Sequence, residues 1–233
     1  VFYQPIISTS TGKYTVAESL LRIPDSPIGP LYPNEFIPIA EETGMIVEIT
    51  YQILDKVCGF INRLSRENIE FDGVHVNFSG RQFSQIGLAE KVAEIIEKNH
   101  TPFSRIKIEI TESILAENAE AVEEFSLEMQ KRGVLIELDD FGTGYSNIVS
   151  VMNTPLDTVK LDKSLIWSAM EKRETAAMVK SLSIVFHEMG LQVLAEGVEN
   201  EEQETFVKSC GIDYIQGCLL YTSPSPRDRT RSR

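Results

Sequence analysis

The sequence predicts an α/β fold of the (β/α) barrel type. Short runs rich in β-branched and aromatic residues alternate with segments of helical apolar spacing over about 200 residues. Acidic or amide residues recur where the strand-like runs end, which is where barrels of this type place their chemistry. With 233 residues, 42% of them hydrophobic, the chain can bury the core of one large domain or two small ones.

The first third of the chain begins with a predicted β-hairpin. Residues 1–9 and 14–23 are strand-like and flank Thr11-Gly12-Lys13, a turn sequence. Residues 24–33 contain four prolines and predict a loop. Apolar residues at helical spacing then predict helices at residues 36–40 and 46–64.

Beyond residue 66 strands and helices are expected to alternate. Strands are expected at residues 74–78, 106–110, 134–138, 158–161, 193–195 and from 214. Helices are expected at residues 89–98, 119–131, 147–152 and 168–189, and from residue 201 to before Gly211. Gly133 and Gly190 should close two of these helices, because glycine readily takes the left-handed conformation that follows a helix. Asn200 should cap the start of the last one.

Composition excludes several classes of protein. The chain has 22 Lys and Arg against 35 Asp and Glu, a net charge of −13, so a general binder of nucleic-acid polymers is excluded. Its three cysteines and three histidines lack metal-ligand spacing, which argues against a zinc site and favours reduced thiols in a cytoplasmic domain. No apolar run is long enough to span a membrane, and no signal peptide is visible.

The two ends of the chain carry their own expectations. Val1 already lies in a strand-like run, which predicts a fragment that lacks an upstream sensory or regulatory domain, and the full-length parent could be membrane-anchored. We expect one domain over residues 1–217 and an atypical, disordered tail over residues 218–233. Residues 222–233 contain no apolar residue to pack. This segment is a native basic tail or, as we favour, non-native sequence from cloning.

Asp139 and Asp140 are the most informative pair of residues. They follow the apolar run of the strand at residues 134–138, and Gly142 and Gly144 come directly after them. Adjacent carboxylates at the end of a buried strand repel each other and are costly to desolvate. A divalent cation is the simplest partner that would compensate them.

Similar polar residues occur at the ends of the other predicted strands. They are Glu18, Asn77, Glu109, Glu112, Lys160, Asp162, Glu196, Glu199 and Gln216. One such residue is usually a solvated loop residue, but a series on successive strands is hard to reach by chance. Oxygen ligands with few histidines suit Mg²⁺ or Mn²⁺, and two such ions could hold a phosphodiester and activate a water. Lys160 could stabilise developing charge, help orient and deprotonate that water, or form a salt bridge with Asp139 or Asp162.

Several short motifs then match a known family in order and combination. They are Tyr3-Gln4-Pro5-Ile6, Glu18-Ser19-Leu20-Leu21-Arg22, Asn77-Phe78-Ser79, Glu109-Ile110-Thr111-Glu112, Asp139-Asp140-Phe141-Gly142-Thr143-Gly144-Tyr145-Ser146, Lys160-Leu161-Asp162, Ala195-Glu196-Gly197-Val198-Glu199 and Gln216-Gly217. Over residues 1–217 the chain resembles the EAL-domain cyclic di-GMP phosphodiesterases of bacterial second-messenger signalling. Ser19 stands where the motif that names the family has Ala.

The resemblance implies a fold and an activity. The fold is a modified TIM (β/α)8 barrel with one antiparallel strand, here truncated at both ends. The activity is hydrolysis of cyclic di-GMP to linear pGpG with two Mg²⁺ or Mn²⁺ ions, in a homodimer. Two alternatives remain open: a non-catalytic cyclic di-GMP receptor, and a protein-interaction module that uses the acidic surface.

The resemblance also implies roles for individual residues. Metal ligands would be Glu18, Asn77, Glu109 and Asp139 for one ion and Asp140 for the other, with Asp162 and Glu196 near the second. Lys160 would activate the water, Gln216 would support the water on the metal, and Glu112 would hold the loop at residues 141–146, which shapes the second metal site and the dimer contact. Substrate contacts would come from Gln4, Leu20 and Arg22, the last near a phosphate.

Overall fold

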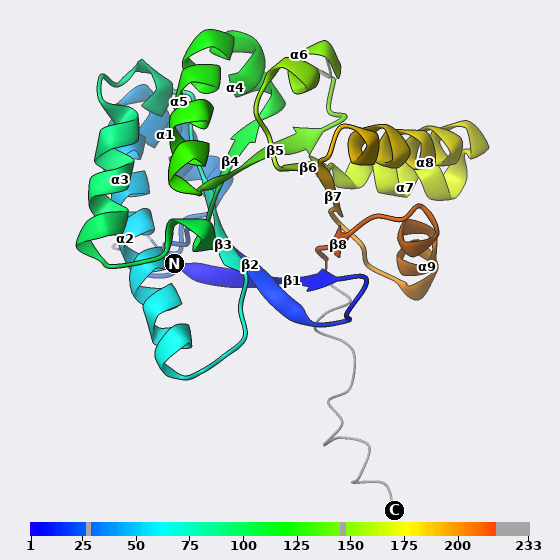
Figure 1. Cartoon of the computed structure of the whole chain (residues 1–233), viewed down its shortest axis with the longest axis horizontal. Coiled ribbons are helices and arrows are strands. Elements are labelled where there is room, and N and C mark those ends of the chain that lie inside the picture. The colour runs from blue at the N-terminus through cyan, green and yellow to red at the C-terminus, as the bar shows by residue number, and fades with distance from the viewer. Residues whose placement is uncertain (27–28, 145–147, 218–233) are drawn as a thin grey trace, which may run out of the picture.

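Eight strands close a barrel in the computed structural model, which describes residues 1–26, 29–144 and 148–217. Each strand pairs with the next one along the chain, and the last pairs with the first (Figure 1). The strands are β1 Phe2–Ser8, β2 Tyr14–Leu20, β3 Gly73–Asn77, β4 Ile106–Thr111, β5 Leu135–Phe141, β6 Thr158–Leu161, β7 Gln192–Ala195 and β8 Tyr214–Ile215.

One strand runs against all the others. β1 is antiparallel to both of its neighbours, β2 and β8, whereas β2 to β8 are parallel to one another. The predicted barrel with one antiparallel strand and the predicted N-terminal hairpin are therefore confirmed. Because seven strands share a direction, their carboxyl ends meet at one mouth of the barrel.

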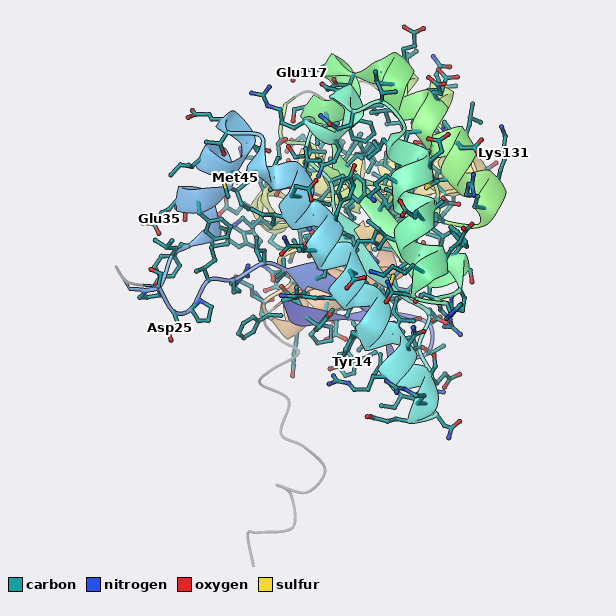
Figure 2. All side chains as sticks on the ribbon, turned by 90° about the vertical axis from the view of Figure 1, so that its left-hand side faces the viewer. Tyr14, Asp25, Glu35, Met45, Glu117 and Lys131 are labelled. Atoms are coloured by element: carbon teal, nitrogen blue, oxygen red, sulfur yellow. The ribbon has the colours of Figure 1, made fainter. Side chains whose placement is uncertain are left out.

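Helices pack around the outside of the barrel. They are α1 Pro33–Glu42, α2 Met45–Arg66, α3 Leu88–Lys98, α4 Glu112–Glu117, α5 Ala119–Arg132, α6 Ile148–Asn153, α7 Lys163–Glu171, α8 Arg173–Glu188 and α9 Glu201–Ser209. Figure 2 shows α2, α3 and α5 side by side along one flank. None of the described helices is long and apolar enough to cross a membrane.

The main core lies between the strands and these helices. Alternate strand residues such as Val76, Ile108, Ile136 and Val159 are completely buried there. Since successive side chains of a strand point to opposite faces, the residues between them point into the barrel. Those inward residues include most of the polar side chains that the sequence placed at the strand ends.

Three expectations about the elements need correction. The pair Asp139-Asp140 lies inside β5 rather than after it. The helix expected at residues 168–189 is two helices, α7 and α8, separated by Lys172 in an extended conformation. Each of the two helices buries its own apolar side, and the two contact each other. This packing requires a break in the chain that the local spacing of apolar residues does not reveal. The six-residue helix α4 was missed because it is too short to show periodicity.

Some expectations fall on residues outside the described ranges. The expected tail at residues 218–233 lies there, and so do residues 145 and 146 of the loop expected to shape the second metal site.

Candidate metal centre at the mouth of the barrel

A fully buried lysine lies at the centre of the polar cluster. Lys160, on β6, has its Nζ 2.6 Å from Glu109 Oε1, 2.9 Å from Asp139 Oδ1 and 2.9 Å from Glu196 Oε1. Glu18 Oε2 lies 3.9 Å away. The barrel therefore gathers carboxylates from β2, β4, β5 and the segment after β7 around one ammonium group.

Two amides hold the carboxylate of Glu18. Asn77 donates from Nδ2 to Glu18 Oε1 at 2.8 Å, and Gln216 donates from Nε2 to Glu18 Oε2 at 2.6 Å. Burial alone would raise the pKa of Glu18, but Lys160 and the two amides lower it. Ser19 leaves this arrangement intact, since its hydroxyl donates to the carbonyl oxygen of His75 at 2.7 Å.

The centre holds more negative charge than Lys160 can neutralise. Burial, aided by the neighbouring acids Glu18 and Asp139, raises the pKa of Glu109 to about 7 against the attraction of Lys160. Burial and Asp139 likewise raise the pKa of Glu196 to about 7. Burial alone would lower the pKa of Lys160, but the surrounding carboxylates raise it well above its ordinary value. Lys160 is therefore a cation in the metal-free centre, and Glu109 and Glu196 hold protons more readily than ordinary glutamates because of their raised pKa values.

Asp139 and Asp140 reach the same site through an irregular backbone. The register of β5 with β6 shifts between Leu138 and Phe141, and Asp140 has a positive φ of 59°. In a regular strand the two side chains would point to opposite faces. Here carboxylate oxygens of Asp139, Asp140 and Glu196 lie within 4.8 Å of one another. Burial and the charge of Asp139 raise the pKa of Asp140 to about 6.

Glu112 and Asp162 bond to the backbone beside this cluster. Glu112, which is buried at the start of α4, accepts a hydrogen bond at Oε2 from the backbone N–H of Gly142 at 3.3 Å. Asp162 caps α7, with Oδ1 accepting from the backbone N–H of Ser164 at 2.9 Å. Its charge contributes to the raised pKa of Asp140, so Asp162 lies near the pair.

The residues expected to contact substrate lie on the β1–β2 side. Gln4 pairs with Glu18 across the hairpin, which brings it to the mouth. Leu20 ends β2 and is partly buried. Arg22 is exposed, and its Nη1 donates to the carbonyl oxygen of Leu21 at 2.9 Å. Among the described residues no ion pair joins Arg22 to the acidic cluster.

Sequence reasoning missed three charged residues inside the barrel: His75, Lys107 and Glu137. Each is buried and lies two positions before a residue of the centre on the same strand. A spacing of two in a strand puts both side chains on one face. That spacing is the signal that could have found them.

The donor set fits divalent cations. Glu109 Oε2 and Gln216 Oε1 are buried and have no hydrogen-bond partner among the described residues. Unsatisfied buried oxygens are costly, and a cation, or a water held beside it, would satisfy them. Carboxylate and amide oxygens are the ligands that Mg²⁺ and Mn²⁺ prefer.

A comparison with protein families identifies the family of this chain. The family model described as "EAL domain" matches residues 1–223. The chain belongs to the EAL domain family. Relatives of this EAL domain include the Pseudomonas aeruginosa bifunctional diguanylate cyclase/cyclic di-GMP phosphodiesterase MucR, which is 32% identical over 94% of this chain and 32% of its own length. The Escherichia coli cyclic di-GMP phosphodiesterase PdeR is 30% identical over 97% of this chain and 34% of its own length.

A solved structure supports the fold of the EAL domain. The PaMucR phosphodiesterase in complex with c-di-GMP has a TM-score of 0.86 and 31% identity, covering 97% of this chain and 92% of that one. The chain spans about a third of the length of the curated relatives named above. The family is thus that of cyclic di-GMP phosphodiesterases, and the curated relatives carry further sequence beyond the matched part.

Proposed function

We propose that this EAL domain hydrolyses cyclic di-GMP to linear pGpG with the help of two Mg²⁺ or Mn²⁺ ions. The observation that carries the proposal is the ring of carboxylates within 4.0 Å of the buried Lys160 Nζ. The names of the relatives supply the substrate. An acidic site repels a phosphodiester unless cations intervene, so metal dependence follows from the charge of the centre.

The residues present suit two cation positions. Glu18, Asn77, Glu109 and Asp139 would hold one ion. Asp140, with Asp162 and Glu196 beside it, would hold the other. When bound, the two ions would supply positive charge to the phosphodiester and lower the pKa of a water molecule.

Lys160 would act as a fixed positive charge and hydrogen-bond donor in the reaction. It is held at Nζ by Glu109, Asp139 and Glu196 and stays protonated in the metal-free centre. An ammonium fixed in a buried site stabilises negative charge that develops beside it far better than one in water does. Gln216, bonded to Glu18 through Nε2, would offer its free Oε1 to the attacking water.

Cyclic di-GMP would bind across the β1–β2 side of the mouth. Gln4 and Arg22 supply a polar and a cationic group there, and Leu20 supplies apolar contact. Within the described part of the chain Arg22 makes one hydrogen bond, to backbone, so its guanidinium would be available for a phosphate.

Hydrolysis of cyclic di-GMP with Mn²⁺, followed by chromatography of the products, tests the proposal. The wild type should release pGpG and lose this activity with a chelator. Glu109→Gln should abolish turnover in a folded protein, whereas Glu188→Gln, an exposed change on α8, should not. A folded wild type that binds cyclic di-GMP but releases no pGpG would instead support the non-catalytic receptor.

A further inference from the structure

A chain of buried charges runs through the barrel beneath the candidate metal centre. Lys107 Nζ lies 2.9 Å from Glu137 Oε1, and Glu137 Oε2 lies 2.8 Å from His75 Nδ1. His75 Nδ1 also lies 2.8 Å from Glu109 Oε1. All four side chains are at most 5% exposed. The chain thus joins a lysine one layer below the mouth to a carboxylate of the centre.

The two oxygens of Glu109 have different surroundings. Oε1 is contacted by Lys160 Nζ at 2.6 Å and by His75 Nδ1 at 2.8 Å. Oε2 is buried and has no hydrogen-bond partner among the described residues. A carboxylate held on one oxygen from two sides cannot rotate without breaking both contacts. Oε2 is therefore the atom that stays free to bind a cation.

The same contacts fix the imidazole of His75. Glu137 and Glu109 both approach Nδ1, while Lys107 anchors the far oxygen of Glu137. A buried ion pair such as Lys107–Glu137 adds little net stability, because desolvation offsets the attraction. The pair instead holds the ring of His75 in one orientation.

We propose that Lys107, Glu137 and His75 form a positioning chain that fixes Glu109 with Oε2 directed to the cation. The inference rests on the proposed function, because it takes Glu109 to be a metal ligand. None of the three residues has to touch the substrate. Groups that orient a metal ligand in this way typically contribute 10- to 100-fold to metal affinity.

Atoms of His75, Glu109 and Glu137 are also close enough to hold a metal ion themselves. We assign their contacts to hydrogen bonds and charge pairing instead. Lys107 already pairs with Glu137, and Lys160 with Glu109, so these two carboxylates leave no excess negative charge for a cation to neutralise, unlike the centre above.

Calorimetric titration of the purified domain with Mn²⁺, without nucleotide, tests the positioning chain. His75→Leu should weaken Mn²⁺ binding by about tenfold. His75→Asn should restore most of the affinity, because the amide nitrogen of Asn takes nearly the place of Nδ1 and can donate to Glu109. With saturating Mn²⁺, His75→Leu should recover most of its kcat, and the KM for cyclic di-GMP should stay unchanged. A folded His75→Leu variant that binds Mn²⁺ as tightly as the wild type would overturn the proposal.

A control variant and a double variant complete the test of the positioning chain. Thr158→Val is a matched control on the neighbouring strand of the same barrel layer, since Thr158 is buried and its hydroxyl has no hydrogen-bond partner in the described structure. It should leave Mn²⁺ affinity unchanged. Lys107→Met/Glu137→Met removes the ion pair as a unit and should weaken Mn²⁺ binding about threefold or more. Unchanged affinity in this folded double variant would overturn the roles of Lys107 and Glu137.

The titrations also separate this inference from the proposed function. A wild type that hydrolyses cyclic di-GMP, together with a His75→Leu variant of normal Mn²⁺ affinity, would refute only the positioning chain. If the wild type binds Mn²⁺ more tightly than the His75→Leu variant but releases no pGpG, only the proposed hydrolysis would be refuted.

Discussion

Glu109 Oε1 and Lys160 Nζ lie 2.6 Å apart, where β4 and β6 reach the mouth of the barrel. The two residues are far apart in sequence, and both are completely buried. Lys160 also forms ion pairs with Asp139 and Glu196 at 2.9 Å each, so one ammonium group faces several carboxylates. Burial, together with the neighbouring acids, raises the pKa of Glu109 despite the attraction of Lys160, and this underlies the predictions that follow.

Replacing Lys160 should separate metal binding from the reaction. Lys160→Met removes positive charge from the centre, so Mn²⁺ should still bind, while kcat should fall by about 10²- to 10⁴-fold. Calorimetry and steady-state kinetics measure the two effects. Lys180→Met, an exposed change on α8, should alter neither. Loss of Mn²⁺ binding by a folded Lys160→Met protein would contradict the assigned role.

Stability should depend on pH through the acids with raised pKa values. The pKa values of Glu109 and Glu196 are about 7 in the folded domain, against 4.5 for an ordinary glutamate in the unfolded chain. Between these pH values the native state therefore binds more protons than the unfolded state. The contribution of these acids to the free energy of unfolding therefore decreases as pH rises from about 4.5 to 7. Thermal melts should show a falling Tm for the metal-free domain between pH 5 and pH 8.

Mn²⁺ should offset the loss of stability at high pH, because it binds the deprotonated carboxylates. We expect saturating Mn²⁺ to raise the Tm by a few degrees more at pH 8 than at pH 6. Equal increases in Tm at both pH values would show that the acids with raised pKa values do not bind the metal.

Asp140→Asn tests the second cation position without straining the backbone. Asparagine tolerates the positive φ of 59° found at Asp140, and the change removes the repulsion with Asp139. Stability should be unchanged or slightly higher, whereas kcat should fall by about 10²-fold or more. The number of Mn²⁺ ions bound, measured by calorimetry, should drop from two to one. A variant with two bound ions would place the second site elsewhere.

Gly142→Ala should damage the backbone beside the centre. Gly142 has a φ of 105°, and an added Cβ would collide with the side chain of Leu165. Gly144 has a φ of 127°, but no atom of the described residues lies within 4 Å of an added Cβ there. Urea unfolding should therefore show Gly142→Ala to be about 1–3 kcal/mol less stable than Gly144→Ala. Equal losses would mean that backbone strain alone, and not the contact with Leu165, governs this turn.

Arg22→Ala should affect substrate binding rather than folding. Arg22 makes one contact to backbone and none to the acidic cluster in the described structure, so the Tm should change little. Losing a phosphate contact should raise the KM for cyclic di-GMP about tenfold with kcat nearly constant. Arg66→Ala, at the end of α2, serves as the control. A fall in kcat alone would place Arg22 in the reaction instead.

The amino-acid sequence by itself determined the fold class and most elements. Alternating strand and helix patterns predicted the barrel, and Asn200 caps α9 through a hydrogen bond to Gln203 as expected. Local signals suffice there, because periodicity and capping are set by neighbouring residues. The polar residues at the strand ends were visible for the same reason.

Only the tertiary structure decided how these residues meet. The break at Lys172 that divides the expected long helix depends on packing between α7 and α8. The bulge at Asp140 that turns two adjacent carboxylates to one site depends on pairing with β6. The burial of His75 against Glu109 arises where β3 and β4 pair and the barrel closes around them. These features are contacts between residues distant in sequence, and the energies of burial and charge pairing that select them exist only after the chain has folded.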